Sequence, residues 1–282
     1  MCSEDLVIPK LFAKSAAGSS FKTALQIQEG GQWKRLTYQE LETQVLKTAG
    51  FLIKQGFKKG DFAGLILENC PEWAVIYLGI IRAGLICVPL DIQLSGDEIK
   101  NLILDCNTKI LFCSEEILIK KINPDIRGLL HKIVVLTKQS LPQPFNADEK
   151  YMSFSEIENT PFQNNLLGTQ SSEDTVCLIY TSGTTDQPKG VLLTHKNICS
   201  NFLSIFQLKL CFPDDNFLAL LPLHHTYSLM ATLIVPLFSG AEVTFPPLGF
   251  NPKDLSSLIK QAKITILAGV PQLFFSVKQY YI

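Results

Sequence analysis

What this sequence lacks first is an excess of charge of either sign. Its 282 residues hold 25 Lys and Arg against 26 Asp and Glu, a formal net charge of −1. Near neutrality gives no electrostatic basis for binding nucleic acid, and no basic run marks an anionic membrane surface. A run of about eighteen uncharged apolar residues, long enough to span a membrane, is also missing. The longest approach to one, 74–90, is interrupted by Arg82.

The eight cysteines form no Cys-x-x-Cys pair, and the four histidines are not spaced with them as zinc ligands. Several cysteines lie in or beside apolar runs, which is typical of reduced, buried thiols in a cytoplasmic protein. The acidic start, Met1 to Asp5, lacks the layout of a signal peptide. We therefore expect a cytoplasmic protein without a transmembrane segment and without nucleic-acid partners, with peripheral membrane contact left open.

The remaining pattern predicts an α/β fold. Short apolar runs such as 62–67, 85–90 and 109–113 alternate with amphipathic helical segments, which favours largely parallel sheets covered by helices. Further strands are predicted over 216–221 and 264–268, and an apolar helix over 227–238. The local signals are a hairpin turn at Gly30-Gly31 and capping boxes that begin at Thr37 and Ser95. Between 138 and 170 the periodicity gives way to Pro, Asn, Gln and Ser. We predict two layered α/β subdomains, residues 1–170 with a linking segment at about 138–170, and residues 171–282.

The least ordinary stretch is 180–195, YTSGTTDQPKGVLLTH, which follows an apolar run predicted to be a buried strand. Its hydroxyls, glycines and one lysine cannot bury an apolar face. They can present backbone N–H groups, hydroxyls and an ammonium group to a polyanion, which indicates a phosphate-binding loop. It is not the common nucleotide loop, because that pattern ends in Gly-Lys-Ser/Thr and this one ends in Lys189-Gly190-Val191.

This stretch resembles the Ser/Thr-Gly-rich phosphate loop of the adenylate-forming superfamily, which includes the acyl-CoA synthetases. The resemblance implies a nucleotide-binding set: Thr181, Ser182, Gly183, Thr184, Thr185, Lys189 and Gly190. The family usually has glycine where this chain has Asp186. A carboxylate about 6 Å from a triphosphate would cost about 2–3 kcal/mol at an effective dielectric near 20. We therefore expect Asp186 to point outward.

A second resemblance lies in 221–228, LPLHHTYS, which follows a predicted strand. Family members keep a histidine near the acyl substrate's carboxylate at the position of His225. The family likeness also implies an acyl pocket formed by Tyr227, which opens an apolar helix, and by Val270 and Pro271 in the turn that starts at Gly269. The apolar lining favours a fatty or aromatic acid. For His224 a structural role is the better interpretation.

The family's later motifs, including its Thr-Gly-Asp segment, are absent from this sequence. The chain thus resembles the N-terminal part of such an enzyme, and the catalytic residues are expected in the part that is missing. The resemblance implies ATP-dependent, AMP-forming activation of a carboxylic acid with Mg²⁺, then transfer to coenzyme A, whose site is not expected in this chain. We expect the chain alone to be inactive. Two alternatives stay open: a fatty acyl-AMP ligase that loads a carrier protein, and a non-catalytic nucleotide- or acyl-binding module.

Overall fold

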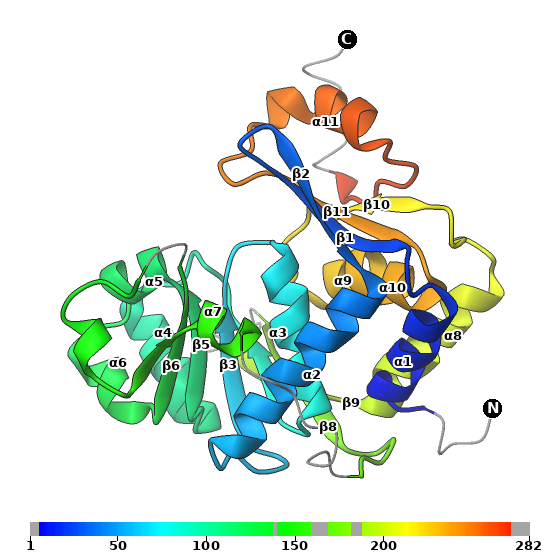
Figure 1. Cartoon of the computed structure of the whole chain (residues 1–282). Helices are drawn as coiled ribbons and strands as arrows, with labels where there is room; N and C mark the ends of the chain where they lie inside the picture. The colour runs from blue at the N-terminus through cyan, green and yellow to red at the C-terminus, as the bar shows by residue number, and fades with distance from the viewer. Residues whose placement is uncertain (1–5, 138–139, 160–168, 182–187, 272–282) are drawn as a thin grey trace. The chain divides into compact units, whose positions relative to one another are not determined.

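The computed structural model describes residues 6–137, 140–159, 169–181 and 188–271. These residues form two units, each containing one β-sheet (Figure 1). The first unit holds the described residues within Met1–Pro9, Thr43–Glu68 and Glu72–Asn197, and the second those within Lys10–Glu42, Asn69–Pro71 and Ile198–Ile282. Each unit is therefore assembled from several separate segments of the chain. The sequence-based expectation was instead two continuous subdomains, residues 1–170 and 171–282.

The first unit contains a seven-stranded sheet in the order β7-β6-β5-β3-β4-β8-β9. All neighbouring strands are parallel except β8 and β9, which form an antiparallel pair. The central strands are continuous apolar runs because helices cover both faces of a parallel sheet. The strands are β3 (Phe62–Ile66), β4 (Ile86–Pro89), β5 (Ile110–Ser114), β6 (Lys132–Leu136), β7 (Tyr151–Ser153), β8 (Thr175–Thr181) and β9 (Lys189–Thr194).

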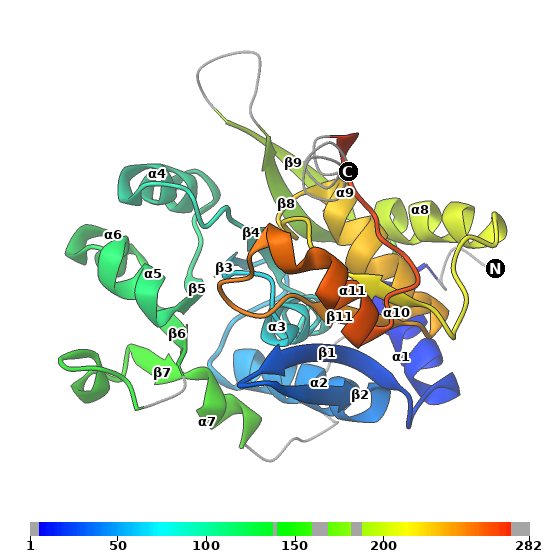
Figure 2. The same cartoon turned by 90° about the horizontal axis from the view of Figure 1, so that it is seen from above.

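Helices lie on both faces of this sheet, as Figure 2 shows. One face carries α4 (Gly96–Cys106), α5 (Glu115–Lys120) and α6 (Pro124–Leu129), whose apolar side chains share one core with the sheet. The opposite face carries α2 (Tyr38–Lys54), α3 (Pro71–Arg82) and α7 (Phe154–Glu158), and a short 3₁₀ turn, η2 (Phe145–Ala147), precedes β7. The capping boxes predicted at Thr37 and Ser95 are both present, so the starts of α2 and α4 are confirmed.

The second unit contains a four-stranded sheet in the order β10-β11-β1-β2. Gly30 and Gly31, with φ of +56° and +79°, make the predicted hairpin turn between β1 and β2. A strand was predicted over 264–268, but the described residues there make only one bridge, between Phe217 and Ile266. The strands are β1 (Thr23–Glu29), β2 (Gln32–Thr37), β10 (Asn216–Leu218) and β11 (Glu242–Phe245), and the helices include α1 (Ile8–Gly18), α8 (His195–Gln207), η5 (Pro252–Asp254) and α11 (Leu255–Ala262).

The apolar helix predicted over 227–238 is present but changes its winding. It consists of α9 (Thr226–Leu229), a π-helical turn η4 (Met230–Ile234) and α10 (Val235–Ser239). The Val235 N–H donates to the Met230 carbonyl, five residues earlier. Pro236 has no N–H and cannot donate the i→i−4 hydrogen bond of an α-helix. The π-helical turn therefore lies just before the position where an α-helix would lose a hydrogen bond. No helix in the described part of the chain is long and apolar enough to cross a membrane.

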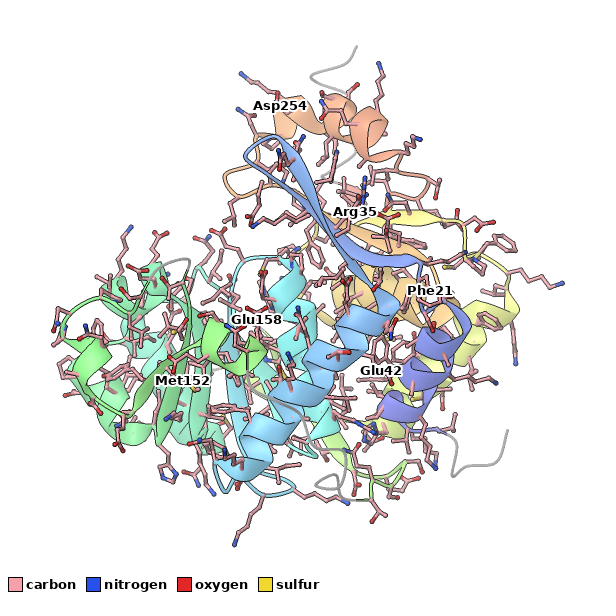
Figure 3. All side chains as sticks on the ribbon, viewed as in Figure 1. Phe21, Arg35, Glu42, Met152, Glu158 and Asp254 are labelled. Atoms are coloured by element: carbon pink, nitrogen blue, oxygen red, sulfur yellow. The ribbon has the colours of Figure 1, made fainter. Side chains whose placement is uncertain are left out.

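A chain of buried polar side chains crosses the second unit's sheet. Gln26 Nε2 donates to Thr244 Oγ1 (2.9 Å), which donates to Asn216 Oδ1 (2.8 Å). Asn216 Nδ2 in turn donates to the carbonyl of Ala262 (2.8 Å). Arg35, labelled on β2 in Figure 3, donates from Nε to Gln26 Oε1 (3.1 Å). The network satisfies polar groups on β1, β10 and β11 that would be costly to bury alone.

Candidate active site

The predicted phosphate loop connects β8 to β9 in the first unit. Of its seven predicted residues, Thr181, Lys189 and Gly190 are described; Ser182, Gly183, Thr184 and Thr185, together with Asp186, lie outside the described residues. Thr181 pairs with Lys189 across the two strands, and Thr181 Oγ1 lies 3.4 Å from the Lys189 carbonyl oxygen. Both side chains are exposed. The described ends of the loop are therefore fixed by strand pairing, with a hydroxyl and an ammonium group at its base.

Gly190 lies at this base, close to two side chains of the neighbouring strand. It pairs with Tyr180 on the neighbouring strand. A Cβ atom at Gly190 would lie 2.8 Å from Leu178 Cδ1 and 3.3 Å from Tyr180 Cε1. The absence of a side chain lets the Leu178 and Tyr180 side chains fill the space beside the β9 backbone, directly after the phosphate-loop segment.

Tyr180 is itself held by the first unit. Its hydroxyl donates to Asp105 Oδ2 at the end of α4 (2.5 Å). Burial, and then this hydrogen bond to a carboxylate, raise the pKa of Tyr180 far above its ordinary value, so the phenol stays protonated. Sequence reasoning missed Asp105, because nothing in the spacing of residues 105 and 180 indicates that they meet.

His195, the last residue of the stretch 180–195, is a structural histidine. It is 1% exposed, and its Nδ1 accepts a hydrogen bond from the Ile8 N–H (3.1 Å) at the start of α1. Burial lowers its pKa from 6.5 to about 4, with Asp174 opposing and Lys59 adding to that shift. The neutral ring therefore serves as an acceptor that fixes the backbone at Ile8.

The residues predicted to contact the acyl substrate lie in the second unit. His225 is exposed and is the N-cap residue of α9, and its ring lies 4.2 Å, centroid to centroid, from that of the half-buried His224. Tyr227 is 53% exposed, and its hydroxyl lies 3.5 Å from the Gly269 carbonyl oxygen. The structure thus brings Tyr227 to the turn that continues into the exposed Val270 and Pro271.

The segment that leads to His225 is held by a residue that sequence reasoning missed. The side chain of Asn69, between β3 and α3, makes three hydrogen bonds to the backbone of residues 219–223. The available signal was its position just after a parallel strand, where α/β sheets place functional groups.

The described residues form no cluster of three or more His, Cys, Asp and Glu side chains that could hold a metal ion. No Mg²⁺ ligand is therefore assigned among them.

The sequence profile of the AMP-binding enzyme family matches residues 12–279, so this chain belongs to that family. Among its relatives, the long-chain-fatty-acid–CoA ligase of Bacillus subtilis (strain 168) is 26% identical over 95% of this chain and 50% of its own length. The chain thus spans about half the length of that relative.

Solved structures agree with the fold. The anthranilate CoA ligase AuaEII in complex with anthranoyl-AMP superposes with a TM-score of 0.84 at 26% identity, covering 97% of this chain and 52% of that one. ATP-bound MatB from Rhodopseudomonas palustris gives a TM-score of 0.78 at 25% identity, covering 95% and 50%. The expected α/β architecture, with largely parallel sheets flanked by helices as in the N-terminal part of adenylate-forming enzymes, is confirmed.

Proposed function

We propose that this chain is the nucleotide- and acid-binding part of an AMP-forming acyl-CoA synthetase that activates a fatty acid. The observation that carries the proposal is the β8–β9 pair. It fixes Thr181 and Lys189 at the two ends of a hydroxyl- and glycine-rich segment, in a chain that the family profile matches over 12–279. A fatty acid is favoured because the B. subtilis relative is a long-chain-fatty-acid–CoA ligase. In addition, α9, which contains Tyr227, continues through η4 and α10 as one apolar helix.

The reaction begins with attack of the acid's carboxylate on the α-phosphorus of ATP, and pyrophosphate leaves. Thr181 and Lys189 bind the phosphates that depart. The ammonium of Lys189 offsets their charge, and a charged hydrogen bond of this kind contributes about 1.5–3 kcal/mol. Such an in-line displacement depends on aligning the attacking oxygen and neutralising the leaving group. His225 orients the acid, and the acyl adenylate then passes its acyl group to the thiol of coenzyme A.

Nucleotide binding is tested by calorimetry with ATP and Mg²⁺ on the wild-type chain and on Lys189→Ala. We expect binding by the wild type and at least a tenfold weaker affinity in the variant. Lys120→Ala is the matched control, because Lys120 is an exposed lysine of the same unit that pairs with Glu116 on α5. An equal loss in both variants, or no heat with the wild type, contradicts the assignment of the loop.

The chemistry is tested on the natural polypeptide that carries these residues. Exchange of labelled pyrophosphate into ATP should require a carboxylic acid and should be fastest with fatty acids. Supplying coenzyme A or an acyl carrier protein as acceptor then separates a synthetase from a fatty acyl-AMP ligase. Exchange that proceeds equally without acid would contradict the proposed activation step.

A further inference from the structure

Asn69 forms a bridge from the loop after β3 to the segment that follows β10. Its Nδ2 donates to the carbonyl oxygens of Ala219 (2.9 Å) and Leu221 (2.8 Å), and its Oδ1 accepts from the Leu223 N–H (3.2 Å). The two carbonyls can only accept and the N–H can only donate, so the partners fix the orientation of the amide. All three bonds lie within the second unit.

These bonds replace a strand ladder. β10 was predicted over 216–221 but ends at Leu218, so the backbone from Ala219 onward is irregular. The Ala219 N–H still donates to the Thr244 carbonyl, while Asn69 bonds to the carbonyls of Ala219 and Leu221 and to the N–H of Leu223. Backbone polar groups at this depth need such partners, because an unpaired buried group costs about 1–3 kcal/mol.

The bonded segment leads directly to His225. Leu223 is buried, with 1% of its surface exposed. The His225 N–H donates to the Pro222 carbonyl (3.3 Å), and the His225 carbonyl accepts the Leu229 N–H (2.9 Å) in the first turn of α9. The backbone on the N-terminal side of His225 is thus held in place by Asn69. The backbone on its C-terminal side is held by the hydrogen bonds of α9.

We propose that Asn69 is a positioning residue for the carboxylic acid substrate, acting through the backbone of residues 221–223 on His225. This proposal rests on the proposed function, in which His225 orients the acid. An amide at position 69 is required because one side chain must supply two donors and one acceptor. Aspartate keeps the acceptor for Leu223 but turns a carboxylate oxygen toward two carbonyl oxygens, and alanine supplies none of the three groups.

The kinetic test measures acid-dependent pyrophosphate exchange in the natural polypeptide for the wild type, Asn69→Ala and Asn69→Asp. We expect KM for the acid to rise tenfold or more in both variants, with KM for ATP changed less than twofold. Asn216→Ala is the matched control, since it removes the side-chain hydrogen bonds of another asparagine, which is buried and lies on β10 of the same unit. Its effect on the two KM values should be equal. An unchanged acid KM in Asn69→Ala, or equal rises in both KM values, overturns the proposal.

A second measurement separates this proposal from the proposed function. Hydrogen exchange of the Leu223 amide reports the Asn69 bond whether or not the protein is active. We expect exchange in Asn69→Ala to be at least tenfold faster at Leu223, and unchanged at Leu229, whose N–H bonds within α9. Absence of acid-dependent pyrophosphate exchange in the wild type would overturn the proposed function. Unchanged protection of Leu223 in Asn69→Ala would overturn the role of Asn69.

Discussion

The hydroxyl of Tyr180 donates a 2.5 Å hydrogen bond to the carboxylate of Asp105, so the strand before the phosphate-loop segment is tied to the end of α4. Tyr180→Phe removes this bond and should lower the free energy of unfolding by about 1 kcal/mol, because the site is partly open to water. Urea denaturation of both single variants and of Tyr180→Phe/Asp105→Asn measures the coupling. If the losses in the two single variants simply add, the bond contributes nothing to stability.

Gly190 and Gly128 make a matched pair for testing the base of the loop. A Cβ at Gly190 would meet the ends of the Leu178 and Tyr180 side chains, whereas nothing lies within 4 Å of one at Gly128 in α6. Gly190→Ala should therefore destabilise the protein by about 1 kcal/mol, the low end of the overpacking range, because the end of the Leu178 side chain can shift. Gly128→Ala should stabilise it by about 0.5–1 kcal/mol through helix propensity. Thermal unfolding of both variants checks the predicted difference in sign.

The stability of the protein should fall in mildly acidic solution because of His195. Its pKa is about 4 in the folded state and about 6.5 when unfolded, so the unfolded state takes up a proton first as the pH falls. The contribution is fully present above pH 6.5 and is lost progressively toward pH 4, at most about 3 kcal/mol at 1.36 kcal/mol for each pKa unit.

Unfolding free energies measured from pH 7.5 to 4 test this expectation. His195→Asn supplies an oxygen that can accept the Ile8 N–H but does not titrate, so its stability should vary less over the same range. Burial acts to raise the pKa of Asp174, but the hydrogen bonds from Lys59 and from the Ser171 N–H, together with the nearby positive charge, lower it on balance. The contribution of Asp174 to stability is therefore lost only below about pH 4. A slope as steep in His195→Asn as in the wild type would assign the pH dependence to other groups.

A comparison of variants at Thr244 and Thr232 measures how much a buried hydrogen-bond network adds to stability beyond a single buried hydrogen bond. Both are fully buried, but Thr244 bonds to Gln26 and Asn216, whereas Thr232 donates only to the Ser228 carbonyl. Thr244→Val leaves two polar groups without this partner and should cost about 2–3 kcal/mol, against about 1 kcal/mol for Thr232→Val. Chemical denaturation of the two variants gives the comparison, and equal losses would show that the network adds nothing.

Sequence alone determined most of the local structure of this protein. Alternating apolar runs, the capping boxes at Thr37 and Ser95 and the Gly30-Gly31 turn indicated the elements, because periodicity, caps and positive φ act over a few residues. The motifs around Lys189 and His225 identified the family for the same reason, since each is a contiguous stretch of sequence.

Only the tertiary structure decided which distant residues meet. Asn69 bonds to Leu221, Tyr180 to Asp105 and His195 to Ile8 across separations of 152, 75 and 187 residues. No pattern in one sequence encodes these pairs, because they result from the order of strands in the sheets and the packing of helices on them. β10 also ends at Leu218, earlier than predicted, and the side chain of Asn69 bonds to backbone groups just beyond the strand's end.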